Sequence, residues 1–126
     1  MRTIVVEYVL STELVSMDVL SKLLNIEPFE IRSSFPEGSI AKPYWSTSIS
    51  SSKNNIEEPL QALVDVLSPK REVIDDVVHE WQVSSSIIVK VRADYFDRPE
   101  LVIPSHQLRF FADLHAELEF DIAYEW

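Results

Sequence analysis

Carboxylates are the most frequent side chains in this sequence that could do chemistry, and several occur in pairs. Glu57-Glu58 and Asp75-Asp76 are adjacent pairs. A longer series lies near residue 126: Glu117, Glu119, Asp121 and Glu125. Carboxylates two residues apart on a strand face stand about 7 Å apart, which suits acid and base roles in glycoside hydrolysis. Such catalysis needs an apolar cleft to raise one pKa, and a strand facing water offers none. The series therefore favours a solvated acidic face, and we predict no catalytic residue.

The other reactive side chains lack the spacing of a known site. His79, His106 and His115 form no histidine pair at i, i+4 and have no glutamate at metalloprotease spacing. We interpret His79 as a cation near a helix C-terminus and His115 as a turn residue. The sequence has no cysteine and one glycine, Gly38, which argues against thiolate chemistry and phosphate-binding loops. Ser50 to Ser52 have no glycine neighbour to form a nucleophile elbow. We predict no metal site and no cofactor, and an enzyme is the less favoured interpretation.

Length and charge limit the class of protein. The 126 residues predict one α+β domain over 1–126, with 46% hydrophobic and 25% charged residues. No apolar run approaches the roughly 20 residues needed to cross a bilayer, so we expect a cytoplasmic protein that does not bind membranes. The net charge of −10 would repel nucleic acid and attract basic proteins.

Apolar and acidic side chains alternate along residues 116–126, with Ala123 as the one exception among the acidic positions. This alternation predicts a β-strand, and the other elements can be placed relative to it. Its apolar positions are Leu118, Phe120, Ile122 and Tyr124. A period of two places these side chains on one face and the carboxylates on the other. We expect the apolar face to lie under helices and the acidic face to meet solvent.

The preceding elements can pair with this strand or cover it. The β-branched run from Arg2 to Leu10 predicts a central strand. Shorter strand patterns occur at 29–32 and 44–49, and a long one at 83–93, where Lys90 and Arg92 could face Glu119 and Asp121. Helical patterns start at Ser16, at Asn55 as cap or with Pro59 in the first turn, at Ser68-Pro69 and at Ser105, with Asn25 ending the first.

The resulting order is β-α-β-β-α-α-β-α-β. Its core βαββαβ predicts a ferredoxin-like antiparallel sheet with helices on one face.

Several of these segments together resemble a known family. The run from Ser16 to Pro28, the pair Trp45-Ser46, the stretch from Ile56 to Pro69 and the strand from Leu118 to Tyr124 are similar to the bacterial domain-of-unknown-function family 4279. Pro59 stands where that family usually has histidine, and Asn25 where glycine would be expected. The resemblance implies the fold, and it brings no established activity, cofactor or functional residue.

Two functions from different classes are compatible with the sequence. The first is a non-catalytic protein-binding module, of the immunity or antitoxin kind, whose acidic sheet face engages a basic protein. The residues assigned to this partner-binding face are Glu117, Glu119, Asp121, Glu125 and Trp126. The second is a small-molecule-binding or enzymatic domain with a pocket near the 33–45 loop, formed with Arg32, Tyr44 and Trp45. A homodimer that covers the open sheet face or joins edge strands is a third arrangement.

Overall fold

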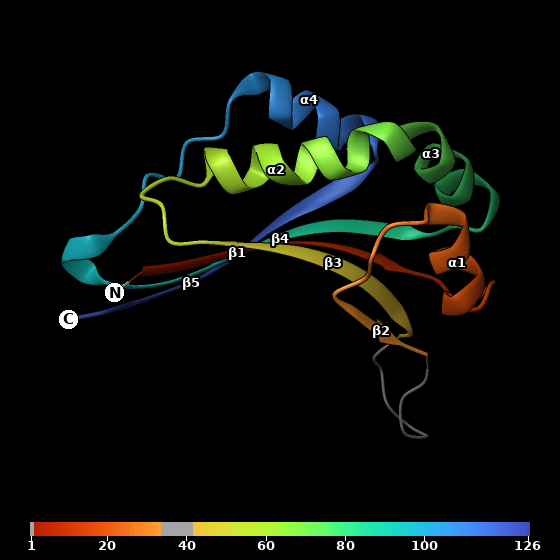
Figure 1. Ribbon diagram of the computed structural model, residues 1–126, viewed down its shortest axis with the longest axis horizontal. Helices are drawn as coiled ribbons and strands as arrows, with labels where there is room; N and C mark the ends of the chain where they lie inside the picture. The colour runs from red at the N-terminus through yellow and green to blue at the C-terminus, as the bar shows by residue number, and fades with distance from the viewer. Residues whose placement is uncertain (1, 34–41) are drawn as a thin grey trace.

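A computed structural model describes residues 2–33 and 42–126, and in it the strands form one layer and helices the other (Figure 1). The α+β class is thereby confirmed. Two short 3₁₀ helices, η1 (Ser68–Lys70) and η2 (Tyr95–Asp97), join longer elements. The longer elements follow in the order β1 (Arg2–Ser11), α1 (Met17–Leu24), β2 (Glu30–Arg32), β3 (Tyr44–Ser51), α2 (Glu57–Leu67), α3 (Arg71–Glu80), β4 (Ser84–Asp94), α4 (Ser105–Asp113) and β5 (Ala116–Glu125).

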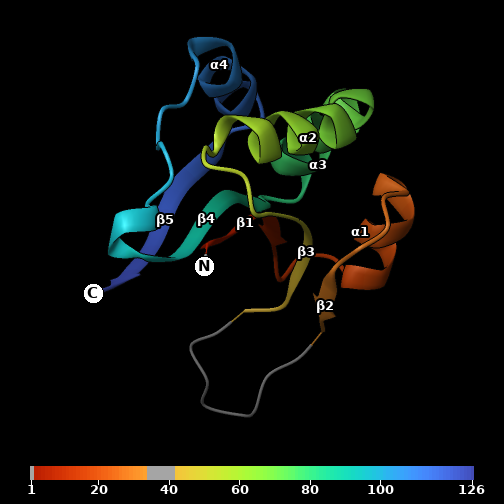
Figure 2. The same cartoon turned by 60° about the vertical axis from the view of Figure 1, so that its left-hand side comes forward.

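The sheet has the strand order β2-β3-β1-β4-β5, with β5 at one edge and β2 at the other (Figure 2). β1 lies centrally, as predicted, and pairs antiparallel with both β3 and β4. β5 pairs parallel to β4, with Leu118 beside Ile87 and Ile122 beside Val91. The prediction of a purely antiparallel sheet was therefore wrong, and the ferredoxin-like description stays a prediction. The cause is the connection through α4, which returns the chain to the starting end of β4, as parallel pairing requires.

The core lies between the sheet and the helices. One face of β1 supplies Ile4, Val6, Tyr8 and Leu10, and all four are fully buried. The helices α1, α2 and α3 meet this face with their own buried stripes: Leu20, Leu24, Leu60, Leu63, Leu67 and Ile74. Helical spacing puts each stripe on one side of its helix, so a single apolar layer is enclosed. The opposite face of the sheet is mostly polar, and Val5, Val9 and Ile88 are apolar residues on it.

The helix ends follow local capping chemistry. The Ser16 hydroxyl accepts a hydrogen bond from the Val19 amide at 3.2 Å, and the Asn55 side chain accepts one from the Glu58 amide at 3.0 Å. Asn25 ends α1 with φ 50°, in the left-handed region. The caps at Ser16 and Asn25 were predicted, whereas Asn55 was one of two predicted starts and lies one residue before Ile56, the N-cap position of α2. The helix expected from Ser68-Pro69 begins instead as the 3₁₀ turn η1, and α3 starts at Arg71. Among the helices of the described residues, none is long and apolar enough to cross a membrane.

Candidate functional site

The acidic residues assigned from the sequence lie together on the edge strand β5. Glu117, Glu119, Asp121 and Glu125 are all exposed, and they occupy alternate positions on one face. Their placement follows from the register with β4, because Lys90 stands beside Asp121 and Ile88 beside Glu119. Among the strands of the described residues, only β4 neighbours β5. Its other edge therefore presents backbone N–H and C=O groups without a strand partner.

The opposite face of β5 is less buried than the sequence predicted. Leu118, Phe120 and Ile122 are 37%, 43% and 38% exposed, so the expectation that helices cover them was only partly right. An edge strand is flanked on one side only, and the helix layer is centred over the inner strands, as Figure 2 shows. Both faces of β5 are consequently accessible to a partner.

The basic residues of β4 neutralise only part of the acidic face. Arg92 forms an ion pair with Asp121 at 3.0 Å, as predicted. Lys90 lies 3.5 Å from Glu7 of β1 rather than beside Glu119. Both members of the Arg92–Asp121 pair are about half exposed, so the pair contributes at most about 1 kcal/mol. Within the described residues, no ion pair involves Glu117 or Glu119.

An aromatic cluster continues this surface beyond the end of β5. The Trp126 ring stacks on Tyr95 with ring centroids 3.8 Å apart, and Phe96 meets Trp126 edge-on at 6.5 Å. The Arg98 guanidinium lies 3.8 Å from the Tyr95 ring centroid. Phe96 and Trp126 are 91% and 90% exposed. Sequence reasoning selected Trp126 and missed the residues of η2, although adjacent aromatics in a polar loop were a signal for them.

The residues proposed for the alternative pocket have different surroundings in the structure. Trp45 is fully buried in the core. A hydrogen bond with the Glu30 side chain raises the pKa of Tyr44, which stands beside Arg32 in the β2–β3 ladder. A surface hollow of about 400 Å³ does lie nearby, lined by residues 12–17, Ser33 and Pro43. Residues 34–41 of the proposed loop lie outside the described residues, so the alternative stays a prediction.

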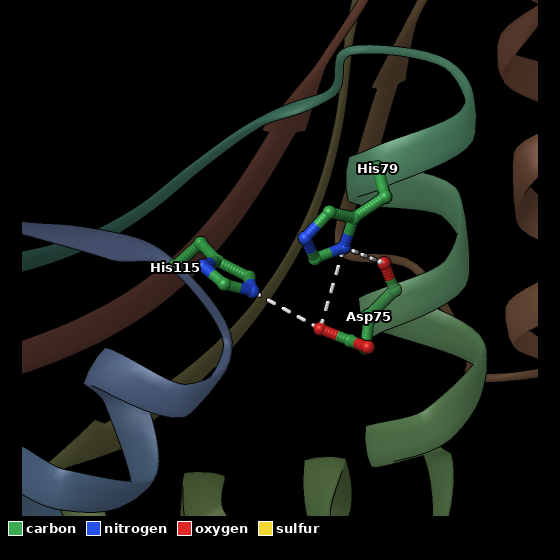
Figure 3. A group of neighbouring side chains, drawn as sticks. All are labelled: Asp75, His79 and His115. Carbon is green, nitrogen blue, oxygen red and sulfur yellow. Dashed lines mark hydrogen bonds and ion pairs between the residues drawn. The ribbon is translucent and has the colours of Figure 1, made fainter.

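A second group of polar side chains comes together on the helix layer, at Asp75, His79 and His115 (Figure 3). Asp75 and His79 are four residues apart on α3, so they share one helix face. His115 reaches them from the turn between α4 and β5. Its Nε2 lies 3.0 Å from Asp75 Oδ1, and His79 Nδ1 lies 3.5 Å from the same oxygen. Two imidazoles and one carboxylate are a set of groups that could hold a metal ion.

The comparisons with known proteins identify the family. The model of the family described as "Domain of unknown function (DUF4279)" matches residues 2–125. The chain belongs to the DUF4279 family. The comparison with curated proteins gave no match, and the comparison with solved structures gave none. The resemblance predicted from the sequence is thus confirmed for this DUF4279 domain.

The DUF4279 domain therefore carries two separate surfaces of interest. One is the β5 edge with its acidic and half-exposed apolar faces, and the other is the Asp75, His79 and His115 group. His115 immediately precedes the first residue of β5, so the two surfaces adjoin in sequence. The first surface offers contact area and charge, while the second offers metal-ligand chemistry.

Proposed function

We propose that this DUF4279 domain is a non-catalytic protein-binding module whose edge strand β5 binds an extended basic segment of a partner protein. The observation that carries the proposal is the accessibility of β5, which has a free edge and two exposed faces over ten residues. An extended segment can add to such an edge through main-chain hydrogen bonds. Alternate side chains of the added strand then lie over the two faces separately.

The two faces specify the chemistry of the partner. Lysine or arginine at alternate positions of the added strand would lie beside Glu117, Glu119 and Asp121. Apolar side chains at the remaining positions would extend the surface formed by Phe120 and Ile122. Opposite charges at neighbouring positions of paired strands contribute roughly 0.2–1 kcal/mol for each pair. The expected ligand is therefore a strand that alternates basic and apolar residues.

A second copy of the domain fits this edge poorly. In a two-fold symmetric antiparallel pair of β5 strands, residues of the same face stand opposite one another. Glu119 would then face Asp121 of the other copy, or Asp121 would face itself. Like charges directly opposite are destabilising, so the charge of β5 favours a basic partner over self-association.

An immunity- or antitoxin-like role is the form of this function that we propose. A domain with net charge −10 would be drawn to a basic toxin, and the long-range attraction would speed the encounter. Strand addition at β5 would then hold a segment of the toxin in an inactive position. This role makes no use of a catalytic residue.

Titration with synthetic peptides tests the proposal. The probe is a labelled peptide that alternates lysine and valine, followed by fluorescence anisotropy at low and at physiological salt. A peptide alternating glutamate and valine and a peptide with the lysines gathered in one half are the controls. We expect binding of the alternating basic peptide alone, and weaker binding as salt is raised. Equal binding of both basic peptides would contradict strand addition.

Charge reversal locates the binding surface. The double variant Glu117→Lys, Glu119→Lys should bind the alternating basic peptide at least about tenfold more weakly, because two attractive contacts become repulsive. The matched control is Asp76→Lys, Glu80→Lys, which changes the net charge equally at exposed positions of α3. The control should retain most of the affinity. Equal losses in the two variants would show that net charge alone attracts the peptide.

A further inference from the structure

The Asp75, His79 and His115 group is assembled by two separate structural features. The i, i+4 spacing on α3 aligns Asp75 with His79, and α4 packs close enough to deliver His115 from its C-terminal turn. A ring nitrogen of each histidine and a carboxylate oxygen of Asp75 all lie within 4.8 Å of one another. The two imidazole rings meet edge to face, with centroids 4.8 Å apart. Their nitrogens and the Asp75 carboxylate therefore converge on a small volume, as Figure 3 shows.

The spacing of these atoms suits a tetrahedral metal ion. Ligand atoms about 2.0–2.1 Å from a tetrahedral zinc ion stand about 3.3–3.4 Å from one another. The distance from Asp75 Oδ1 to His115 Nε2, 3.0 Å, is close to this value, and a ring nitrogen of His79 lies within 4.8 Å of the other two ligand atoms. The three side chains are 46–65% exposed, so neighbouring groups leave them room to turn toward a shared ion.

One hydrogen bond of His79 leaves its other ring nitrogen available as a metal ligand. Its Nδ1 lies 2.8 Å from the main-chain oxygen of Asp75. A carbonyl oxygen can only accept, so Nδ1 donates the proton and the lone pair remains on Nε2. Metal-bound histidines characteristically donate their second ring N–H to a carbonyl or carboxylate in this way.

The backbone of His115 adopts the left-handed conformation, which directs the chain out of the end of α4. His115 has φ 59°, in the left-handed region where glycine is favoured. A histidine there holds the ring over α3 from a tight turn, and strained positions of this kind cluster at functional sites.

We propose that Asp75, His79 and His115 bind a divalent transition-metal ion of the zinc class. Two imidazole nitrogens and one carboxylate are ligands for zinc rather than for magnesium or calcium, which prefer oxygen. Three protein ligands leave a fourth position for water. A surface hollow of about 520 Å³, lined in part by Arg71, Glu72 and His115, borders the site and gives solvent access to that position. The site is independent of the peptide-binding role proposed for β5.

Zinc titration of the metal-free full chain tests this site by isothermal calorimetry. We expect one zinc ion per chain, with binding that weakens on acidification because protons compete for the imidazoles. The variants Asp75→Asn, His79→Gln and His115→Asn should each lower the affinity at least about tenfold. Asparagine is chosen at His115 because it tolerates the left-handed conformation. The matched control is His106→Gln, which removes the remaining histidine, bonded to Gln61 away from the site.

Two further measurements distinguish zinc binding at Asp75, His79 and His115 from nonspecific binding to surface carboxylates. Zinc at a concentration that saturates the wild type should raise the melting temperature of the wild type and of His106→Gln, and it should raise that of His115→Asn clearly less. Cobalt should give the visible absorption of a tetrahedral complex in the wild type and in His106→Gln, but not in His115→Asn. Zinc binding that is equal in wild type and His115→Asn, or that magnesium displaces, would overturn the proposal.

Discussion

At the scale of single residues, burial controls the ionisation of Tyr8. The Tyr8 hydroxyl lies in the core and accepts a hydrogen bond from Ser85 at 2.7 Å. Burial raises the pKa of Tyr8 to about 12, and the Ser85 hydrogen bond opposes this shift. The charged form is disfavoured because a phenolate in the core would lose its hydration.

The shift at Tyr8 predicts a loss of stability in alkali. Above pH 10 a tyrosine of the unfolded chain has released its proton, whereas Tyr8 of the folded chain keeps its proton to about pH 12. The free energy of unfolding should therefore fall as the pH rises through this interval, by at most about 1.4 kcal/mol per pH unit. Tyr8→Phe should reduce this decline. Urea unfolding at several alkaline pH values measures it, with Tyr124→Phe on β5 as the control. Identical slopes in the two variants would be inconsistent with the burial of Tyr8.

At the scale of elements, the end of α1 depends on one left-handed residue. Asn25 has φ 50° and ψ 41°, and its amide donates to the Ser21 carbonyl at 3.0 Å. Asparagine is, after glycine, among the residues that best tolerate this conformation. The departure from the expected glycine is thus accommodated without a change in the helix end.

Two substitutions at Asn25 should act in opposite directions. Asn25→Ala should lower the free energy of unfolding by about 1 kcal/mol, because the alanine Cβ comes too close to the following carbonyl oxygen in the left-handed region. Asn25→Gly should be neutral or slightly stabilising. Chemical denaturation of both variants measures the difference. A loss of stability in Asn25→Gly as large as in Asn25→Ala would show that the asparagine side chain itself is required.

The elements that the sequence predicted well are those with strong local signals. A β-branched run located β1, period-two alternation located β4 and β5, and capping residues located both ends of α1. The direction and position of β5 were not predictable in this way, because alternation does not reveal which strand is the neighbour.

The group of Asp75, His79 and His115 was missed for a related reason. The Asp75 and His79 spacing is visible in the sequence, but His115 is 40 residues from Asp75 and joins it only through packing of α4.

At the scale of the whole molecule, charge and topology together predict a monomer. The net charge is −10, and the edge most exposed to strand pairing is lined with carboxylates. Net charge far from zero opposes self-association, and symmetric pairing of β5 would place acidic residues opposite one another. Light scattering coupled to size exclusion should therefore give the 14.5 kDa mass of one chain at neutral pH and low salt.

The charge-reversal variant Glu117→Lys, Glu119→Lys can pair its new lysines with the remaining carboxylates of a second copy. It should therefore dimerise more readily than the wild type. A wild-type mass of twice the chain under these conditions would contradict the prediction, because it would mean that other contacts outweigh the charge repulsion between two copies.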